Sequence, residues 1–348
     1  MASKPEGLHC FLELNEFMSE QWTLPFQFRE FGSSDYDRLA ELFGRIFPEY
    51  DRTPNEWRHW DSMVDKSKFY FHRFACLSSV SKEILGFGQC QHSMEMFHPN
   101  KFWLEIWVDP NHQKKGVGAA IYEKLRQELA DKAAVTCWGM TREDMTIPVE
   151  FAKKRGFVES RRAWESRIDP SKFDPHPFRK YQEKATSREI TISSLEEERK
   201  HDPDYKVKLH ELVNSALTDM PRPDEFTPIP YEQWVTMELD NPDLTPEGYM
   251  IAKDGDKYVG LSALWRSETE PQGLYQGNTG VLREYRGQGI AISLKLRVLE
   301  FAKKEGYERV KTWNDSTNAA MLGINMMLGF KRQVGWIIFE KKLAHTAK

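Results

Sequence analysis

The sequence predicts an α/β protein of two tandem domains, each with a β-sheet flanked by helices. Its 348 residues exceed one typical domain of roughly 150 residues. The stretches around Val108 and Val281 resemble each other, and Gly156 and Gly329 follow them at the same offset of 173 residues (281 − 108 and 329 − 156). Strand-like and helix-like segments also come in the same order in both halves. The second half is therefore expected to duplicate the first.

In the first half, strands are expected where β-branched and aromatic residues gather, and helices where apolar residues recur every three or four positions. The helix after the glycine-rich segment places Ile121, Leu125 and Leu129 on one face. Gly156 is a suitable residue to end the last helix. The expected order is strand 26–32, helix 33–47, a helix after 53–54, strands 69–80, 84–95 and 101–108, the helix after the glycines, strand 133–138, helix 146–156 and strand 157–168.

The second half repeats this order, and its central helix carries Ile290, Leu294, Val298 and Phe301. The expected order is strand 188–194, helices 205–219 and 230–239, strands 248–253, 257–266 and 273–281, the glycine-rich segment, helix 290–301, strand 309–313, helix 316–328 and strand 330–342.

Two segments lie outside the repeat. Residues 169–187 contain three prolines and many charges, a composition typical of a linker. Residues 1–24 form an N-terminal extension. The expected domains are therefore 25–168 and 188–348, with the linker between them.

Composition excludes several classes of protein. The chain is 40% hydrophobic and carries a net charge of −4, with acidic and basic residues mixed, so it is expected to be globular and not to bind nucleic acid. No apolar run approaches the roughly 18–20 residues that cross a bilayer, so we expect a cytoplasmic protein with no membrane contact. No metal site is expected, because the cysteines lack metal-type spacing and are typical of ordinary thiols. They are Cys10, Cys76, Cys90 and Cys137.

The glycine-rich segments carry the chemistry. In each half a strand ends at a valine, and Gln or Arg, two residues, Gly, one residue and Gly or Ala lead into a helix. This pattern aims backbone N–H groups and the positive end of the helix dipole at one spot, where an anion such as a pyrophosphate is expected.

Three other interpretations compete with a pyrophosphate site of this kind. A P-loop requires Gly-Lys-Ser/Thr, which neither segment has. A dinucleotide-binding fingerprint requires a third glycine at the place where the two segments carry Ile121 and Ile292. A plain turn before a helix fits one glycine pair, but the recurrence of the pair makes a plain turn the weaker interpretation.

The sequence resembles the GNAT superfamily of acetyl-coenzyme A (acetyl-CoA)-dependent N-acyltransferases. The shared features are the Gln/Arg-x-x-Gly-x-Gly/Ala segment after a strand and a later helix that ends in Gly-Phe, and they occur twice, within 26–168 and 188–343. The arrangement is similar to the tandem architecture of mycothiol synthase. The resemblance implies a mixed, mostly antiparallel twisted sheet in each domain.

The resemblance also implies the residues that bind acetyl-CoA: the strand end contacts the pantetheine arm, the loop amides hold the pyrophosphate, and an Asn on the penultimate helix adds a contact. In the second half these are Val281, Leu282, Arg283, Arg286, Gly287, Gln288, Gly289, Ile290, Ala291 and Asn318. In the first half they are Val108, Gln113, Lys114, Lys115, Gly116, Val117 and Gly118.

The resemblance leaves the catalytic groups incomplete. The family often has a Tyr four residues before Gly-Phe that protonates the leaving thiolate, and Asn325 and Ala152 stand there. Because Asn325 and Asn318 are polar, we expect the second half to be catalytic and the first to be degenerate. A Glu often serves as the base in this family, and Glu105 is the candidate in the first half.

The leading hypothesis is an N-acetyltransferase that moves an acetyl group from acetyl-CoA directly to a primary amine of a small molecule. Such an enzyme is expected to be a monomer or homodimer. The alternatives are a CoA-binding pseudoenzyme that senses or scaffolds, and an O- or S-acyltransferase.

Overall fold

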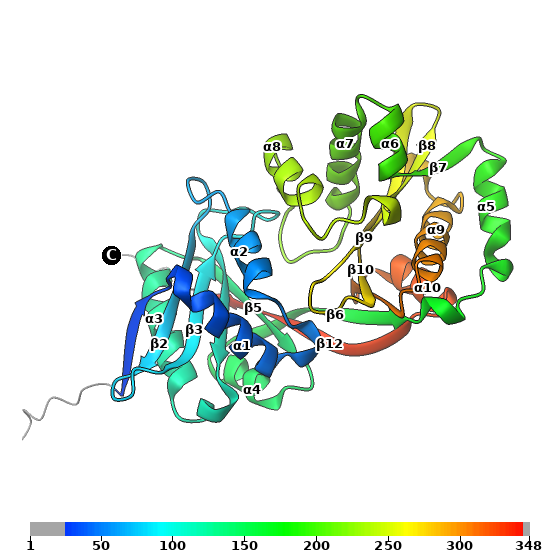
Figure 1. Cartoon of the computed structure of the whole chain (residues 1–348). Coiled ribbons are helices and arrows are strands. Elements are labelled where there is room, and N and C mark those ends of the chain that lie inside the picture. The colour runs from blue at the N-terminus through cyan, green and yellow to red at the C-terminus, as the bar shows by residue number, and fades with distance from the viewer. Residues whose placement is uncertain (1–24, 344–348) are drawn as a thin grey trace, which may run out of the picture.

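The computed structural model describes residues 25–343. Both halves contribute to one continuous sheet of twelve strands, in the order β1-β2-β3-β4-β5-β12-β6-β11-β10-β9-β8-β7 (Figure 1). The ladders β4–β5 and β10–β11 are parallel, and the other neighbouring pairs are antiparallel. This confirms two tandem α/β units with a mixed, mostly antiparallel sheet.

The first half contains six strands and four α-helices among the described residues. They are β1 (Phe26–Glu30), α1 (Tyr36–Ile46), α2 (Pro54–Ser62), β2 (Phe71–Ser78), β3 (Ile84–Gln91), β4 (Lys101–Val108), α3 (Val117–Asp131), β5 (Thr136–Arg142), α4 (Thr146–Lys154) and β6 (Val158–Ile168).

The second half follows helix α5 (Arg179–Thr186) and has the same plan with one additional helix, α6. Its elements are β7 (Ile190–Ser194), α6 (Leu195–His201), α7 (Tyr205–Thr218), α8 (Tyr231–Trp234), β8 (Met250–Asp254), β9 (Lys257–Trp265), β10 (Gly273–Val281), α9 (Ile290–Lys304), β11 (Arg309–Asp315), α10 (Ala319–Met327) and β12 (Lys331–Lys342).

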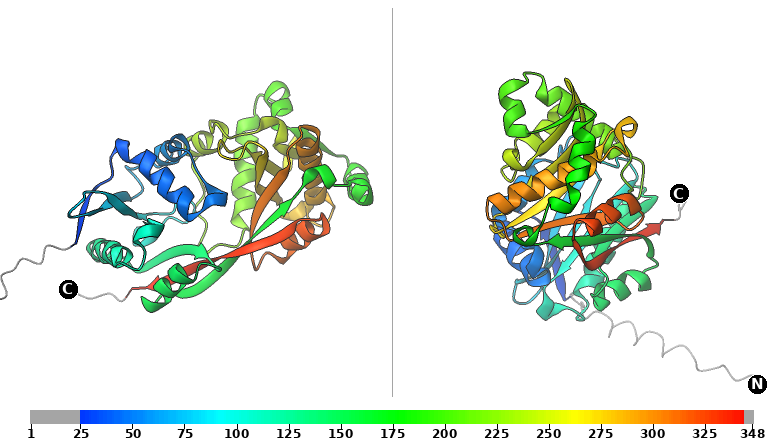
Figure 2. Two further views of the ribbon diagram at one scale, coloured as in Figure 1. Left: turned by 60° about the horizontal axis from the view of Figure 1, so that its bottom comes forward. Right: turned by 90° about the vertical axis from the view of Figure 1, so that its right-hand side faces the viewer.

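The last strand of each half is exchanged with the other half. Strand β12 lies between β5 and β6, and β6 lies between β12 and β11, so each closes the sheet of the opposite half. The two long strands run side by side across the molecule (Figure 2). Trp336, Ile337 and Phe339 of β12 are therefore buried in the cores of the first half.

Each sheet half is covered on both faces. Helix α3 packs on one face of the first half through Ile121, Leu125 and Leu129, as the spacing predicted, and α1 and α2 pack on the opposite face. In the second half α9 covers one face and α7 the other. The two glycine-rich loops thus lie at equivalent places, at the N-termini of α3 and α9.

The segment predicted as a linker contains helix α5, which its proline-rich composition did not indicate. Ala185 of α5 and the preceding Phe173 are buried in the core beneath α9. Phe173 also stacks on Phe178 at 5.9 Å between ring centroids. The connection between the halves is therefore packed onto the second half.

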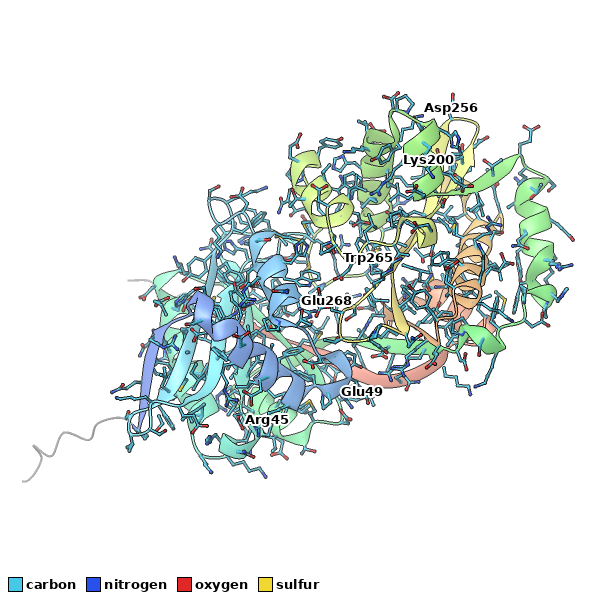
Figure 3. The ribbon with its side chains drawn as sticks, viewed as in Figure 1. Arg45, Glu49, Lys200, Asp256, Trp265 and Glu268 are labelled. Carbon is cyan, nitrogen blue, oxygen red and sulfur yellow. The ribbon has the colours of Figure 1, made fainter. Side chains whose placement is uncertain are left out.

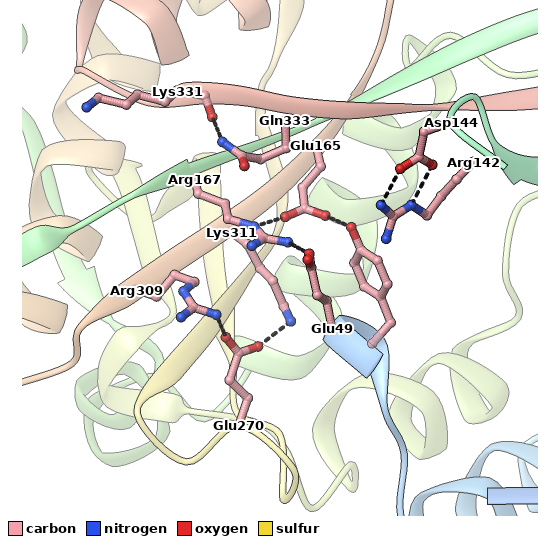
Figure 4. Close-up of polar contacts among 11 residues, drawn as sticks. Glu49, Arg142, Asp144, Glu165, Arg167, Glu270, Arg309, Lys311, Lys331 and Gln333 are labelled. Carbon is pink, nitrogen blue, oxygen red and sulfur yellow. Dashed lines mark hydrogen bonds and ion pairs between the residues drawn. The ribbon is translucent and has the colours of Figure 1, made fainter. Parts of the chain in front are cut away.

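The loop after β9 joins the halves on the side of α2. Thr53 Oγ1 donates to Glu268 Oε2 at 2.7 Å, and Glu56 Oε1 accepts from Ser267 Oγ at 3.1 Å. Trp265 and Glu268 lie at this junction (Figure 3). On the sheet below, Glu165 of β6 contacts Tyr50 and Arg167 (Figure 4).

Three of the four cysteines, Cys76, Cys90 and Cys137, are buried free thiols. Cys10 and the predicted extension 1–24 lie outside the described residues. Within residues 25–343, no helix is both long and apolar enough to cross a bilayer.

Candidate functional site

Two parallel strands separate in each half and leave a strand edge free. The β4–β5 ladder ends at Trp103↔Trp138, although β4 continues to Val108. The β10–β11 ladder ends at Gln276↔Thr312, although β10 continues to Val281. Backbone N–H and C=O groups of the remaining residues therefore face a wedge between the strands, where an extended ligand finds hydrogen-bond partners.

Each wedge leads to a glycine loop with the same backbone conformation. Gly116 and Gly289 have φ of +89° and +87°, in the left-handed region that favours glycine. They are the N-caps of α3 and α9, so the unpaired N–H groups of both first turns face outward. Such a helix start attracts an anion.

The first residue of each loop motif ties the loop to the strand that precedes it. Gln113 Nε2 donates to the carbonyl of Val108 at 3.3 Å, and Arg286 Nε donates to the carbonyl of Val281 at 3.0 Å. This shared contact explains why a long side chain with N–H donors occupies both positions. It fixes the loop relative to the wedge.

The structure places all the predicted cofactor residues in these wedges and loops, except Asn318. The strand ends are Val108 and Val281, the loops contain Gln113, Lys114, Lys115, Gly116, Leu282, Arg283, Arg286, Gly287, Gln288 and Gly289, and the first helical turns contain Val117, Gly118, Ile290 and Ala291. Their contact with acetyl-CoA remains a prediction.

The second loop is already in contact with other protein groups. Asp219 accepts hydrogen bonds from Arg283 and Arg286, and these two arginines lower the pKa of Asp219 to about 2. Helix α5 lies against the same loop. Lys184 Nζ donates to the carbonyl of Gly287 at 2.9 Å, and the carbonyl oxygen of Tyr181 lies 3.0 Å from where a Cβ on Gly289 would stand.

The two asparagines expected in the second site both bond to other groups of the protein. Asn318 caps α10, because its side chain accepts from the N–H of Met321. Asn325 is 1% exposed, and its Nδ2 donates to Asn314 Oδ1 at 2.6 Å within the core. Each side chain therefore makes one hydrogen bond within the protein, while the buried Oδ1 of Asn325 has no partner among the described residues.

Glu105 stands on the free part of β4. Its neighbours Leu104 and Phe102 pack beneath α3, so Glu105 faces the opposite side of the sheet, toward α1 and α2. The side chain is half-buried, and within residues 25–343 it has no hydrogen-bond or ion-pair partner. Its burial raises the pKa of Glu105, while the positive charges of Arg73 and Arg52 oppose this rise.

The equivalent place in the second half has no carboxylate. Asn278 lies there, within a bulge between Gln276 and Thr279 of β10. Tyr275 of the same strand is 36% exposed, so it is not a core residue. The positive charge of Arg52 opposes the rise in the pKa of both Tyr275 and Glu105, which belong to different halves.

A cavity of about 540 Å³ opens beside Arg52. Residues of both halves line it, since Thr269 comes from the loop after β9. The other lining residues are Asp37, Ala40, Glu41, Gly44, Arg45, Asp51, Thr53 and Pro54.

Sequence reasoning missed the polar residues behind Glu105. Asp61, Arg73 and Gln89 are all less than 9% exposed and are joined by hydrogen bonds. The signal in the sequence for two of them is a charged or amide residue inside an apolar strand, Arg73 in β2 and Gln89 in β3, whereas Asp61 lies in α2. Within residues 25–343, no group of three or more His, Cys, Asp or Glu side chains has the arrangement of a metal site.

Comparisons with known proteins agree with this geometry. The chain is similar to a tandem GNAT protein from the clavulanic acid biosynthesis pathway, at 16% identity and a TM-score of 0.70, over 91% of this chain and 98% of that one. It is also similar to a GCN5-related N-acetyltransferase from Sphaerobacter thermophilus, at 17% identity and a TM-score of 0.65, over 91% of this chain and 96% of that one. At such identities the likeness shows the fold.

No curated protein matches the sequence. The model of the acetyltransferase (GNAT) family, however, matches residues 36–157 and 208–330, which together make up more than half of the chain. The chain therefore belongs to the GNAT acetyltransferase family and is an acyltransferase.

Proposed function

We propose that this acyltransferase moves the acetyl group of acetyl-CoA directly to the primary amine of a small molecule, and that the first half carries the reaction. Family membership supports transfer of an acyl group from acyl-CoA. The acetyl donor, the amine acceptor and the choice of half are our inference from the geometry around Glu105.

The first half fits acetyl-CoA. The free edge of β4 offers backbone partners to an extended pantetheine arm, and the loop from Gln113 to Gly118 offers N–H groups to a pyrophosphate. A Cβ on Gly116 would meet only the ring of Phe26, at 3.7 Å, so the loop is free of the tight backbone contact present at Gly289. Acetyl-CoA bound there supplies the activated acetyl group.

Glu105 is the observation that carries the proposal. An amine with a pKa near that of Lys, ~10.4, is mostly protonated at neutral pH and must lose a proton before it attacks a carbonyl. Glu105 faces the side of the sheet toward α1 and α2 and has no direct partner among the described residues, so its carboxylate is available to accept that proton. Its raised pKa makes it a stronger base than a solvated Glu.

The second half is a weaker candidate for catalysis, contrary to the expectation from its asparagines. Asn318 and Asn325 have structural partners, and the amide of Asn278 cannot accept the proton that Glu105 accepts. Helix α5 also lies on its loop. These observations favour the half that the sequence suggested to be degenerate.

In the proposed reaction, different residues of the first half bind the donor and accept the proton. The loop and the edge of β4 hold the donor, and Glu105 takes the proton from the ammonium group of the acceptor. The neutral nitrogen then attacks the thioester carbonyl, the C–S bond breaks, and the leaving thiolate takes up the second proton of that nitrogen, so that a neutral amide and the CoA thiol are released. Because the acetyl group passes directly to the nitrogen, the reaction requires no Ser-His-Asp triad.

The test is Glu105→Gln, with Glu83→Gln as a matched control because Glu83 is exposed just before the start of β3. Release of CoA thiol is followed with a panel of primary amines, and acetyl-CoA binding is followed by calorimetry. We expect Glu105→Gln to lower kcat by about 10²–10⁴-fold while acetyl-CoA still binds. Turnover within about twofold of the control would contradict the role of Glu105.

A further inference from the structure

A buried chain of hydrogen bonds runs through the first half toward Glu105. Arg73 Nη1 and Nη2 donate to the two carboxylate oxygens of Asp61 at 2.7 and 2.9 Å. Arg73 Nε donates to Gln89 Oε1 at 2.6 Å, and Tyr36 donates its hydroxyl hydrogen to Asp61 at 2.8 Å. The guanidinium group is thus held at three nitrogens, in a fixed orientation.

The chain ends beside Glu105. In the sheet register Arg73 of β2 stands opposite Gln89 of β3, and Gln89 stands opposite Glu105 of β4. Directly opposite residues of antiparallel strands point to the same face, with Cβ atoms about 4.5–5.5 Å apart. The three side chains therefore form one row across the face toward α1 and α2.

The orientation of the Gln89 amide follows from this row. Gln89 is 3% exposed, and its Oε1 is turned toward Arg73 as an acceptor. The Nε2 group must then point away from Arg73, because the oxygen and nitrogen occupy opposite sides of the amide. A fixed N–H donor is thereby presented on the side of Glu105.

The fold itself does not require this network of hydrogen bonds. In the second half Ala252, Gly260 and Val281 pair as Cys76, Gly86 and Val108 do in the first. The row that corresponds to Arg73, Gln89 and Glu105 therefore consists of Tyr249, Ala263 and Asn278. An uncharged side chain, that of the buried Tyr249, takes the place of Arg73 there. The buried ion pair is thus a feature of the half that contains Glu105, although burying charges is costly to stability.

We propose that Asp61, Arg73 and Gln89 are positioning residues for Glu105: Asp61 fixes Arg73, Arg73 fixes the amide of Gln89, and the N–H of Gln89 holds the carboxylate of Glu105 for proton transfer. This inference rests on the proposed function, because it assigns the chain to the base of that reaction. The apo geometry of such contacts is commonly loose and tightens when substrates bind.

Several charged groups affect the pKa of Glu105, and a substitution of Gln89 leaves them unchanged. Arg52 and Arg73 favour its ionised form, and Asp61 disfavours it. The charges of Glu56, Asp243 and Tyr275 act on Arg52 in turn. A substitution of Gln89 by an uncharged residue leaves all of these charges in place, so a change in the pH profile would report on the amide.

The experiment compares Gln89→Leu with Gln91→Leu, which has the same substitution two residues farther along the same face of β3. The pH dependence of kcat and the KM for acetyl-CoA are measured in the intact protein. We expect Gln89→Leu to lower kcat by about tenfold and shift the acid limb of its pH profile by about one pH unit, with KM changed less than about twofold. Gln91→Leu should behave as the unmodified protein.

A second variant guards against loss of folding. Gln89→Glu keeps an acceptor for Arg73 and adds a carboxylate beside Glu105, so the acid limb should move to higher pH. If both Gln89 variants keep the kcat and pH profile of Gln91→Leu while Glu105→Gln is inactive, the positioning role is overturned and the proposed function stands. If Glu105→Gln is active, the proposed function itself fails.

Discussion

The two loop glycines offer a matched pair of substitutions that identifies which loop serves the reaction. Gly116 and Gly289 both occupy the left-handed region, at φ of +89° and +87°. Any L-residue in this conformation costs about 1–2 kcal/mol of stability. Gly116→Glu and Gly289→Glu therefore carry the same backbone penalty, and a difference between them reflects their surroundings and ligands.

The surroundings differ in one respect. A Cβ at Gly116 meets the ring of Phe26 at 3.7 Å, an ordinary contact, whereas a Cβ at Gly289 stands 3.0 Å from the carbonyl oxygen of Tyr181 in α5. Gly289→Glu must therefore shift α5, and we expect it to be the less stable of the two variants in the absence of ligand.

The effect on acetyl-CoA follows from charge. A carboxylate about 4 Å from a phosphate is repelled by ~4 kcal/mol per unit charge at an effective dielectric constant of about 20. That energy corresponds to about a thousandfold in Kd. If the first loop serves the reaction, Gly116→Glu should abolish turnover at micromolar acetyl-CoA, while Gly289→Glu should retain most of it.

Two assays separate these outcomes. CoA thiol release measures turnover, and thermal unfolding measures binding, since a ligand at about a hundredfold its Kd stabilises a protein by ~2.7 kcal/mol. Loss of turnover in Gly289→Glu, with turnover retained in Gly116→Glu, would refute our choice of half. The active site would then be assigned to the second half, as Asn318 and Asn325 had suggested.

Two further predictions concern buried charges. Lys295 is 1% exposed, bonds to Gln276 at 2.6 Å, and has its pKa lowered by burial to about 7. Between about pH 7 and about pH 10 the unfolded chain therefore binds one more proton than the folded chain. The free energy of unfolding should rise across that range by roughly 4 kcal/mol. Urea titrations of Lys295→Met should show a flatter rise. Arg167→Met leaves the fully buried Glu165 without its cation and should lower the free energy of unfolding by about 3–5 kcal/mol in the same assay. Glu49→Gln, at the exposed end of the same contacts, should lower it by less than ~1 kcal/mol. Equal losses in the two variants would contradict the argument.

Local patterns predicted much of the fold. The spacing of Ile121, Leu125 and Leu129 indicated the buried face of α3, and the constant offset between Gly156 and Gly329 indicated the duplication. The loop conformation followed from Gly116 and its copy, because few other residues adopt positive φ.

The features that were missed depend on contacts between distant residues. Helix α5 is stabilised by packing on α9 through Ala185, while prolines before it masked its short helical pattern. The row from Arg73 to Glu105 is formed by pairing of three strands, and no spacing along the chain reveals it. Asn325 stands where the family often has a catalytic Tyr, but in the structure its side chain bonds to Asn314 of strand β11.

Strand exchange is the fourth such feature, because a repeat of constant offset is equally compatible with separate or exchanged last strands. In the structure β12 carries Trp336, Ile337 and Phe339 into the first half.

This exchange predicts that the first half does not fold alone. Burying each of the side chains Trp336, Ile337 and Phe339 contributes about 1.5–3 kcal/mol, so a fragment 1–187 loses roughly 5–9 kcal/mol, as much as the whole stability of many proteins. It also leaves β5 and β6 without the strand between them. We therefore expect fragment 1–187 to be unfolded by circular dichroism when expressed alone, and to fold as a complex when co-expressed with 188–348. A cooperative thermal transition of the isolated fragment at the temperature of the intact chain would show that the exchanged strand is dispensable, and that the two halves are independent domains.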